Sequence, residues 1–211
     1  MDHFQSDKYA VRLDKLAHAN ITWNGEGLRQ MLDARLQYFS EGRVSFKDIF
    51  ADGVDADAAF KSFISIATNS PRELIKLMDT VIREHDARGN SAPDLLDAES
   101  VELGQDKYVV ETIGGFFPDK LLQQVYRLGC DAFVNKDVQG AFKIGDQSAR
   151  VKIKNWEDAG LVKQSGTLAP NSELGGQPAY RFIIADPRVE RIIERQLIGD
   201  VGDDPAADLD E

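Results

Sequence analysis

The segment from residue 133 to residue 184 constrains the fold of this 211-residue chain most strongly. Residues 136–144 can form one short helix, and a break at 145–147 separates it from a second predicted helix over residues 148–158. The second helix carries three apolar side chains at helical spacing, Ala149, Ile153 and Trp156. The pattern therefore predicts two consecutive helices joined by a tight turn.

Two strands are expected after these helices. Gly160 suits the C-cap of the second helix, and the aliphatic run at residues 161–164 then favours a strand. A polar loop, residues 165–177, leads to a second strand over residues 179–184. The order helix, turn, helix, strand, loop, strand predicts a helical unit with a small β-hairpin at its side.

Residues 131–184 resemble winged-helix domains, with the strongest likeness in Lys154-Asn-Trp-Glu-Asp-Ala-Gly-Leu-Val162. A recognition helix that ends in glycine and leads into an aliphatic strand is typical of the junction between recognition helix and wing. The resemblance implies duplex DNA as the partner. The side chains expected to face the groove, its phosphates or the neighbouring backbone are Ser148, Arg150, Lys152, Lys154, Asn155, Lys163, Gln164 and Arg181. The alternative is a winged helix that only contacts protein.

The charge distribution bears on both interpretations. The net charge is −11, which argues against a protein that coats DNA. However, residues 131–199 carry ten Lys/Arg and nine Asp/Glu, so this region is close to neutral. Residues 200–211 carry six acids and no base, which predicts an acidic disordered tail that could compete for the basic surface. Three cations within residues 150–154 are compatible with phosphate contacts and equally with a solvated helix face.

The first half of the chain is predicted to be mainly helical. Helices are expected over residues 24–40, 45–50, 55–68, 70–88, 94–102, 107–116 and 119–128, and a final one over 188–197. Ser70, Pro71 and Glu73 favour a capping box at the start of the fourth of these helices. Phe39 is expected on a buried stripe, Trp23 in the core, and His85 at a partly exposed helix end.

The segment Asn69-Ser-Pro-Arg-Glu-Leu-Ile-Lys-Leu77 resembles the second sensor segment of P-loop ATPases of the AAA+ and STAND kind. The likeness extends over residues 10–88 and includes Ile21–Asn24, Leu32–Leu36 and Phe46–Phe50. It implies a helical lid, which a winged helix often follows in such ATPases. By this resemblance Arg72 is the nucleotide-sensing residue, since a guanidinium at a helix start adds positive charge near free backbone donors. The alternative for Arg72 is an ordinary surface arginine in the first helical turn.

The sequence departs from that family in one respect that decides the chemistry. It contains no G-x-x-x-x-G-K-[ST] phosphate loop, so the chain is not expected to hydrolyse nucleotide alone. It looks like the C-terminal portion of such an ATPase, or a relative without the nucleotide-binding core. The three histidines have no metal-ligand spacing, and Cys130 reads as a small buried residue. We therefore expect no enzyme activity, no cofactor and no metal.

These observations predict a mainly α protein, a helical lid-like bundle followed by a winged helix-turn-helix domain with a small β-wing. The expected divisions are a bundle over residues 1–92, a helical connector over 93–118, the winged helix over 119–199 and the acidic tail over 200–211. The sequence contains no run of about 18 apolar residues, so no membrane helix is expected. A single cysteine fits a reducing cytoplasm. DNA binding is the leading hypothesis. The second is a regulatory domain that contacts an ATPase core or another protein.

Overall fold

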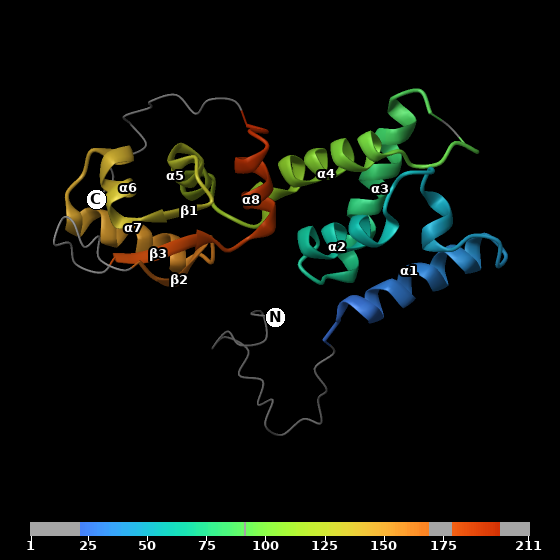
Figure 1. The fold of residues 1–211 in the computed structure, drawn as a ribbon, viewed down its shortest axis with the longest axis horizontal. Helices are drawn as coiled ribbons and strands as arrows, with labels where there is room; N and C mark the ends of the chain where they lie inside the picture. Colours follow the sequence, from blue (N-terminus) through green and yellow to red (C-terminus); the bar gives the residue numbers. More distant parts are fainter. Residues whose placement is uncertain (1–21, 91, 169–178, 199–211) are drawn as a thin grey trace, which may run out of the picture.

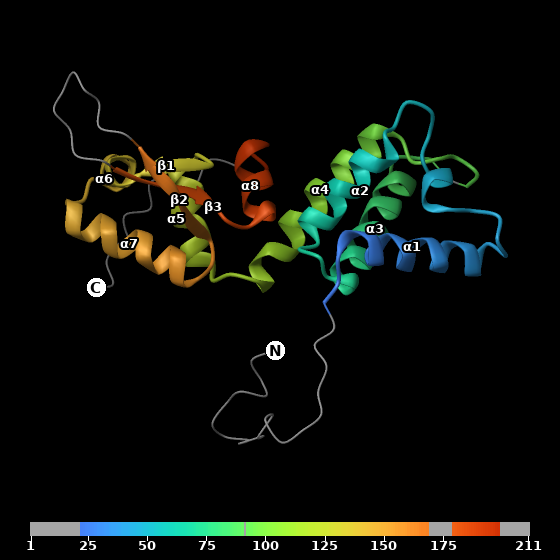
Figure 2. The same cartoon turned by 60° about the horizontal axis from the view of Figure 1, so that its bottom comes forward.

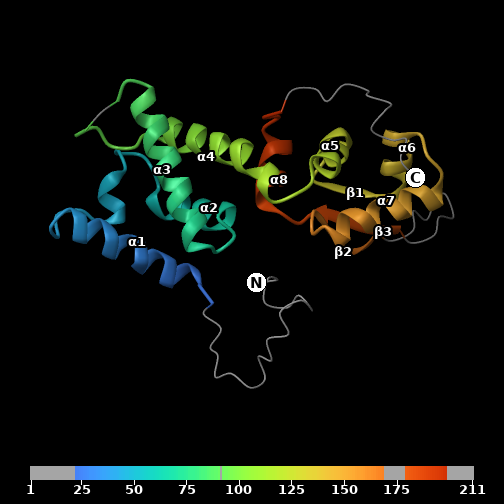
Figure 3. The ribbon, with the colours of Figure 1, turned by 180° about the vertical axis from the view of Figure 1, so that it is seen from behind.

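The computed structural model describes residues 22–90, 92–168 and 179–198. Within these ranges the predicted class is confirmed, because the chain is mainly helical with a small antiparallel sheet. Figure 1 shows two lobes, a helical bundle over residues 25–115 and a helix–sheet lobe over residues 119–184. The last helix, α8 (Pro187–Glu194), lies between them, as the view from behind in Figure 3 also shows.

The bundle contains four α-helices and two 3₁₀ turns within the described residues. They are α1 (Gly25–Phe39), η3 (Phe46–Ile49), α2 (Ala56–Ile66), α3 (Pro71–Ala87), α4 (Ala98–Thr112) and η4 (Ile113–Gly115). Each α-helix begins where a short polar side chain accepts a hydrogen bond from a backbone N–H of its first turn. These caps are Asn24, Asp55, Ser70 and Asp97.

The closest helix pair in the bundle is α3 and α4. Gly104 of α4 faces Val81 of α3 so closely that a Cβ on the glycine would lie 2.5 Å from the valine Cα. The hydroxyl of Tyr108 donates a buried hydrogen bond of 2.8 Å to Glu73. Of the expected capping box, Ser70 does accept a hydrogen bond from the helix start. The reciprocal interaction is wrong, because the Glu73 carboxylate binds Tyr108 and Lys76 instead of the helix start.

The structure corrects four other expectations for the bundle. Residues 98–112 form one helix, although two helices over 94–102 and 107–116 were expected. Phe39 is 76% exposed and Trp23 is 40% exposed, because α1 lies at the edge of the bundle and buries only one side. His85 is buried, with its Nδ1 atom 2.9 Å from the Ser100 hydroxyl of α4. These differences arise because α4 covers the end of α3 and leaves α1 uncovered.

The helix–sheet lobe consists of three helices and the antiparallel sheet. Its elements are α5 (Asp119–Leu128), β1 (Ala132–Val134), α6 (Asn135–Phe142), α7 (Asp146–Asp158), β2 (Val162–Leu168) and β3 (Ala179–Ile184). The strand order is β1-β3-β2. Strand β3 therefore pairs with β2, as the hairpin pattern predicts, and also with β1, a strand that the sequence analysis did not predict.

Trp156 of α7 is the centre of this lobe. It is fully buried, and its ring contacts Phe133 of β1 and Phe142 of α6. Its indole N–H donates a buried hydrogen bond of 3.0 Å to the side chain of Gln124 in α5. The prediction of Trp156 as a core residue is confirmed, and its contacts hold α7 against α5, α6 and β1.

Helix α8 joins the two lobes through ion pairs with α4. Arg191 Nε lies 2.8 Å from Asp106 Oδ1, and Arg195 Nε lies 2.9 Å from Asp106 Oδ2. Both arginines also reach the Glu102 carboxylate, at 2.8 and 3.1 Å. The Asp106 side chain is 11% exposed, so this network is shielded from water better than ordinary surface pairs.

Replacing Asp106 with alanine is expected to loosen this junction. The change leaves Arg191 and Arg195 with Glu102 as their remaining acidic partner. We expect a loss of about 1–2 kcal/mol in the free energy of unfolding, because partly buried ion pairs contribute more to stability than exposed ones. Small-angle scattering should show a larger radius of gyration as α8 separates from α4. Asp79→Ala, which removes an exposed i,i+4 pair with Arg83, is the control. Equal behaviour of the two variants would contradict a role for Asp106 in holding the lobes together.

Within the part of the chain that the structure describes, no helix combines the length and apolar character needed to cross a bilayer. The division of the chain into domains at residues 92, 118 and 199 remains a prediction. Helix α4, which falls within the expected connector over 93–118, packs along α3.

Candidate nucleic-acid interface

Helix α7 carries most of the residues predicted to contact DNA. It begins at Asp146, with Gly145 as its N-cap, two residues before the expected start at Ser148. Its inward side is formed by Ala149, Ile153 and Trp156, all buried as the spacing predicted. Figure 2 shows α7 along an outer edge of the helix–sheet lobe, so its opposite side faces solvent.

The structure divides the predicted residues of α7 into two groups. Arg150, Lys154 and Asn155 are exposed on the outer side of the helix. Ser148 and Lys152 are half-buried on a flank, and the Lys152 ammonium lies 4.6 Å from the centre of the Phe142 ring. A lysine over an aromatic face gains cation–π attraction there. Lys152 therefore belongs in part to the packing between α6 and α7.

The charge along α7 changes from one end to the other. Arg150 forms an exposed ion pair of 3.0 Å with Asp146, a contact that contributes little and can be exchanged for a phosphate. Lys154 makes no ion pair with another described residue. The last turn carries Glu157 and Asp158, both exposed. A polyanion would therefore meet positive charge in the first and middle turns and negative charge in the last turn.

The two predicted cations of the hairpin lie at different places on the sheet. Arg181 of β3 is exposed and stands opposite Gly166, where β2 has a bulge. Lys163 stands opposite Ile183, nearer the end of the sheet that adjoins α8. Burial and neighbouring carboxylates raise the pKa of Glu190 in α8, and the nearby charge of Lys163 offsets only part of this rise. The structure thus brings Lys163 toward an acidic neighbour, whereas Arg181 forms no ion pair with another residue of the described ranges.

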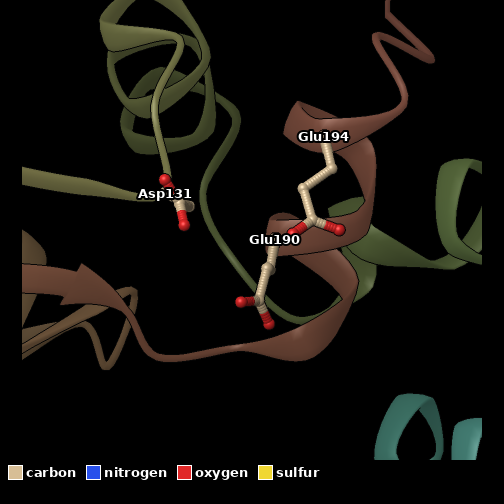
Figure 4. Close-up of side chains that lie close together, drawn as sticks. All are labelled: Asp131, Glu190 and Glu194. Atoms are coloured by element: carbon tan, nitrogen blue, oxygen red, sulfur yellow. The ribbon is translucent and has the colours of Figure 1, made fainter.

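That neighbour is part of an acidic trio, Asp131, Glu190 and Glu194, shown in Figure 4. Their carboxylate oxygens lie within 4.8 Å of one another. Partial burial and the two neighbouring carboxylates raise the pKa of Glu190, which outweighs the effect of Lys163. Three close carboxylates are the residues here that could hold a hard cation. Exposed acidic groups of this kind are common without one, and the trio mainly makes this end of the lobe unfavourable for a polyanion.

Two outward residues of α7 were missed by the sequence analysis. Gln147 and Val151 are exposed on the same side as Asn155, eight and four residues before it. Residues at this spacing lie along one face of a helix. Their spacing is visible in the sequence, but a search for positively charged side chains does not select a glutamine or a valine.

Arg72, the residue predicted to sense nucleotide, lies in the first turn of α3 in the bundle, away from the α7 surface. It is exposed and forms no ion pair with any described residue, Glu73 and Glu84 included. Burial opposes ionisation of Glu73, but hydrogen bonds from Lys76 and Tyr108 outweigh it and lower its pKa. Burial and this hydrogen bond also raise the pKa of Tyr108.

The chain was compared with protein-family models, with curated proteins and with solved structures, and nothing matches in any of the three comparisons.

Proposed function

We propose that residues 119–184 form a winged-helix unit. The order α5, β1, α6, α7, β2, β3 and the strand order β1-β3-β2 support this proposal. In such a unit α6 and α7 are the helix-turn-helix pair, α7 is the recognition helix, and the β2–β3 hairpin is the wing. The loop between β2 and β3, residues 169–178, lies outside the described residues.

We infer that the function of this unit is binding to duplex DNA through α7. One observation carries the inference: the face of α7 opposite the Trp156 core is exposed and holds Arg150, Lys154 and Asn155. Arg181 adds a cation on the neighbouring hairpin. With so few cations, binding is weak and strongly weakened by salt, since each phosphate contact adds to the salt dependence. The function proposed is binding and not catalysis.

Removing the exposed cations tests this function. We expect the variant with Arg150, Lys154 and Arg181 changed to alanine to lose at least about tenfold in affinity for duplex DNA at low salt, with a shallower salt dependence. Gel-shift titration at several salt concentrations measures both. The control changes Arg35, Lys61 and Arg83 of the bundle to alanine, which removes the same charge elsewhere. DNA binding is rejected if the wild-type chain is not retained, or if both triple variants bind equally.

The acidic segment 200–211 should oppose DNA binding. Its six acids lower the local potential and compete with phosphates for the same cations. Truncation after Gly199 is therefore expected to raise the affinity for DNA about threefold or more at low salt, and the gain should fade as salt screens the charges. Changing the six acids to Asn and Gln should have the same effect at full length. An unchanged affinity in both variants would show that this segment does not compete.

A regulatory role by protein contact is the second candidate. Helix α7 carries three acids and three bases, Asp146, Glu157, Asp158, Arg150, Lys152 and Lys154, so its surface is mixed in charge. A mixed surface suits a protein partner better than a polyanion. By the resemblance to AAA+ and STAND ATPases, the partner would be a nucleotide-binding core, with Arg72 near the nucleotide. Titration of such a core with the wild-type chain and with Arg72→Ala tests this alternative.

A further inference from the structure

Three exposed side chains without charge follow one another along the outer face of α7, which also carries Lys154. Gln147, Val151 and Asn155 follow one another at intervals of four residues and form one ridge along the helix. All three are exposed, and Val151 is 45% exposed. The side-chain amides of Gln147 and Asn155 make no hydrogen bond to another residue in the described ranges. This ridge is therefore free to contact a ligand.

Two exposed cations adjoin this ridge: Lys154 follows Val151 by three residues and so shares the outer face, and Arg150 lies farther round the helix. Arg150 and Lys154 lie on the side of the ridge that includes Asp146, and Lys152 lies on the other side against Phe142. When a helix enters the major groove, its outermost residues reach the base edges and its flanks reach the phosphates. The ridge thus stands where bases are read, with the positive charge of Arg150 and Lys154 placed beside it for the backbone.

The chemistry of the ridge selects among the base pairs. Asn and Gln amides match the N6 donor and N7 acceptor of adenine, and an apolar side chain packs against the methyl group of thymine. Guanine is read most often by Arg or Lys, and the three ridge residues include neither. An amide, an apolar side chain and a second amide in line therefore fit the major-groove edge of A·T pairs.

We propose that α7 reads A·T base pairs in the major groove, with Gln147 and Asn155 contacting adenine and Val151 contacting a thymine methyl. The proposal rests on the DNA-binding function proposed above and specifies its ligand. It makes these three residues specificity-determining, whereas Arg150, Lys154 and Arg181 supply affinity that does not depend on sequence.

Modified duplexes test this assignment directly. Wild-type protein is titrated with a mixed-sequence A·T-rich duplex without A-tracts, and with a G·C-rich duplex of equal length. The A·T-rich duplex is also prepared with deoxyuridine for thymidine, which removes the methyl, and with 7-deazaadenine, which removes the N7 acceptor. Both changes alter the major groove alone. We expect affinity at least about fivefold higher for the A·T-rich duplex, and a loss of that preference in both modified duplexes.

Single substitutions separate the contributions of the three residues. Val151→Ala should make binding insensitive to deoxyuridine, and Asn155→Ala or Gln147→Ala should make it less sensitive to 7-deazaadenine. Gln123→Ala, at an exposed amide of α5, is the matched control and should behave as the wild type. Wild-type binding that is equal for all duplexes overturns this inference and leaves DNA binding intact. Failure to bind any duplex overturns the proposed function itself.

Discussion

Trp156→Ala is expected to lower the free energy of unfolding of the helix–sheet lobe by about 3–5 kcal/mol, the usual range for removing a fully buried large aromatic side chain. The ring contacts Phe133 and Phe142, and its N–H binds Gln124, so the variant loses packing on three elements at once. The Gln124 side chain, itself buried, also loses its hydrogen-bond partner, which adds a desolvation cost.

The second tryptophan provides the matched control. Trp23 is 40% exposed at the start of α1, so Trp23→Ala should cost less than about 1 kcal/mol. Denaturant titration followed by near-ultraviolet circular dichroism measures both variants, and far-ultraviolet spectra show whether the helices persist. Similar losses from the two substitutions would contradict the assignment of Trp156 as the centre of the lobe. Trp156→Ala should also abolish any DNA retention, because α7 loses its support.

Gly104→Ala is expected to destabilise the bundle by about 2 kcal/mol net, although alanine is the better helix former. The added methyl group would lie 2.5 Å from the Cα and 2.8 Å from the Cγ2 of Val81, so α3 and α4 must move apart. Overpacking of this kind typically costs about 1–3 kcal/mol and occasionally more. Because the added methyl group would contact backbone, the cost of overpacking at Gly104 should lie toward the upper end of that range. The better helix propensity of alanine offsets about 1 kcal/mol of this cost.

Gly140 is the control for this prediction. It also lies inside a helix, α6, but a Cβ there would meet nothing within 4 Å. Gly140→Ala should therefore stabilise the protein by about 0.5–1 kcal/mol through helix propensity alone. Thermal unfolding of both variants gives the result. A rise in Tm for Gly104→Ala would show that α3 and α4 are not held this closely in solution.

Local patterns predicted most of the individual helices correctly. Polar side chains that accept hydrogen bonds from the first turn are visible in sequence, and Asn24, Asp55 and Ser70 start helices where expected. The spacing of Ala149, Ile153 and Trp156 likewise identified the buried side of α7. Such features depend on residues within a few positions of one another, which is why the sequence alone reveals them.

The failures concern contacts between segments that are distant along the chain. Two helices were expected over residues 94–102 and 107–116, but in the structure one continuous helix runs between them and approaches Val81 at Gly104. Strand β1 has three residues and depends on pairing with β3 some fifty positions later. His85 is buried because Ser100 of another helix covers it.

For the candidate interface, the sequence by itself determined that α7 exists, which of its sides is buried, and that cations cluster on it. The tertiary structure decided which of the predicted cations remain available: the Lys152 ammonium lies over the Phe142 ring, and Lys163 lies near Glu190 of the acidic trio. The physical reason is that helix periodicity is a short-range property of the backbone. The charge and packing around a side chain depend on whichever segments the fold brings beside it.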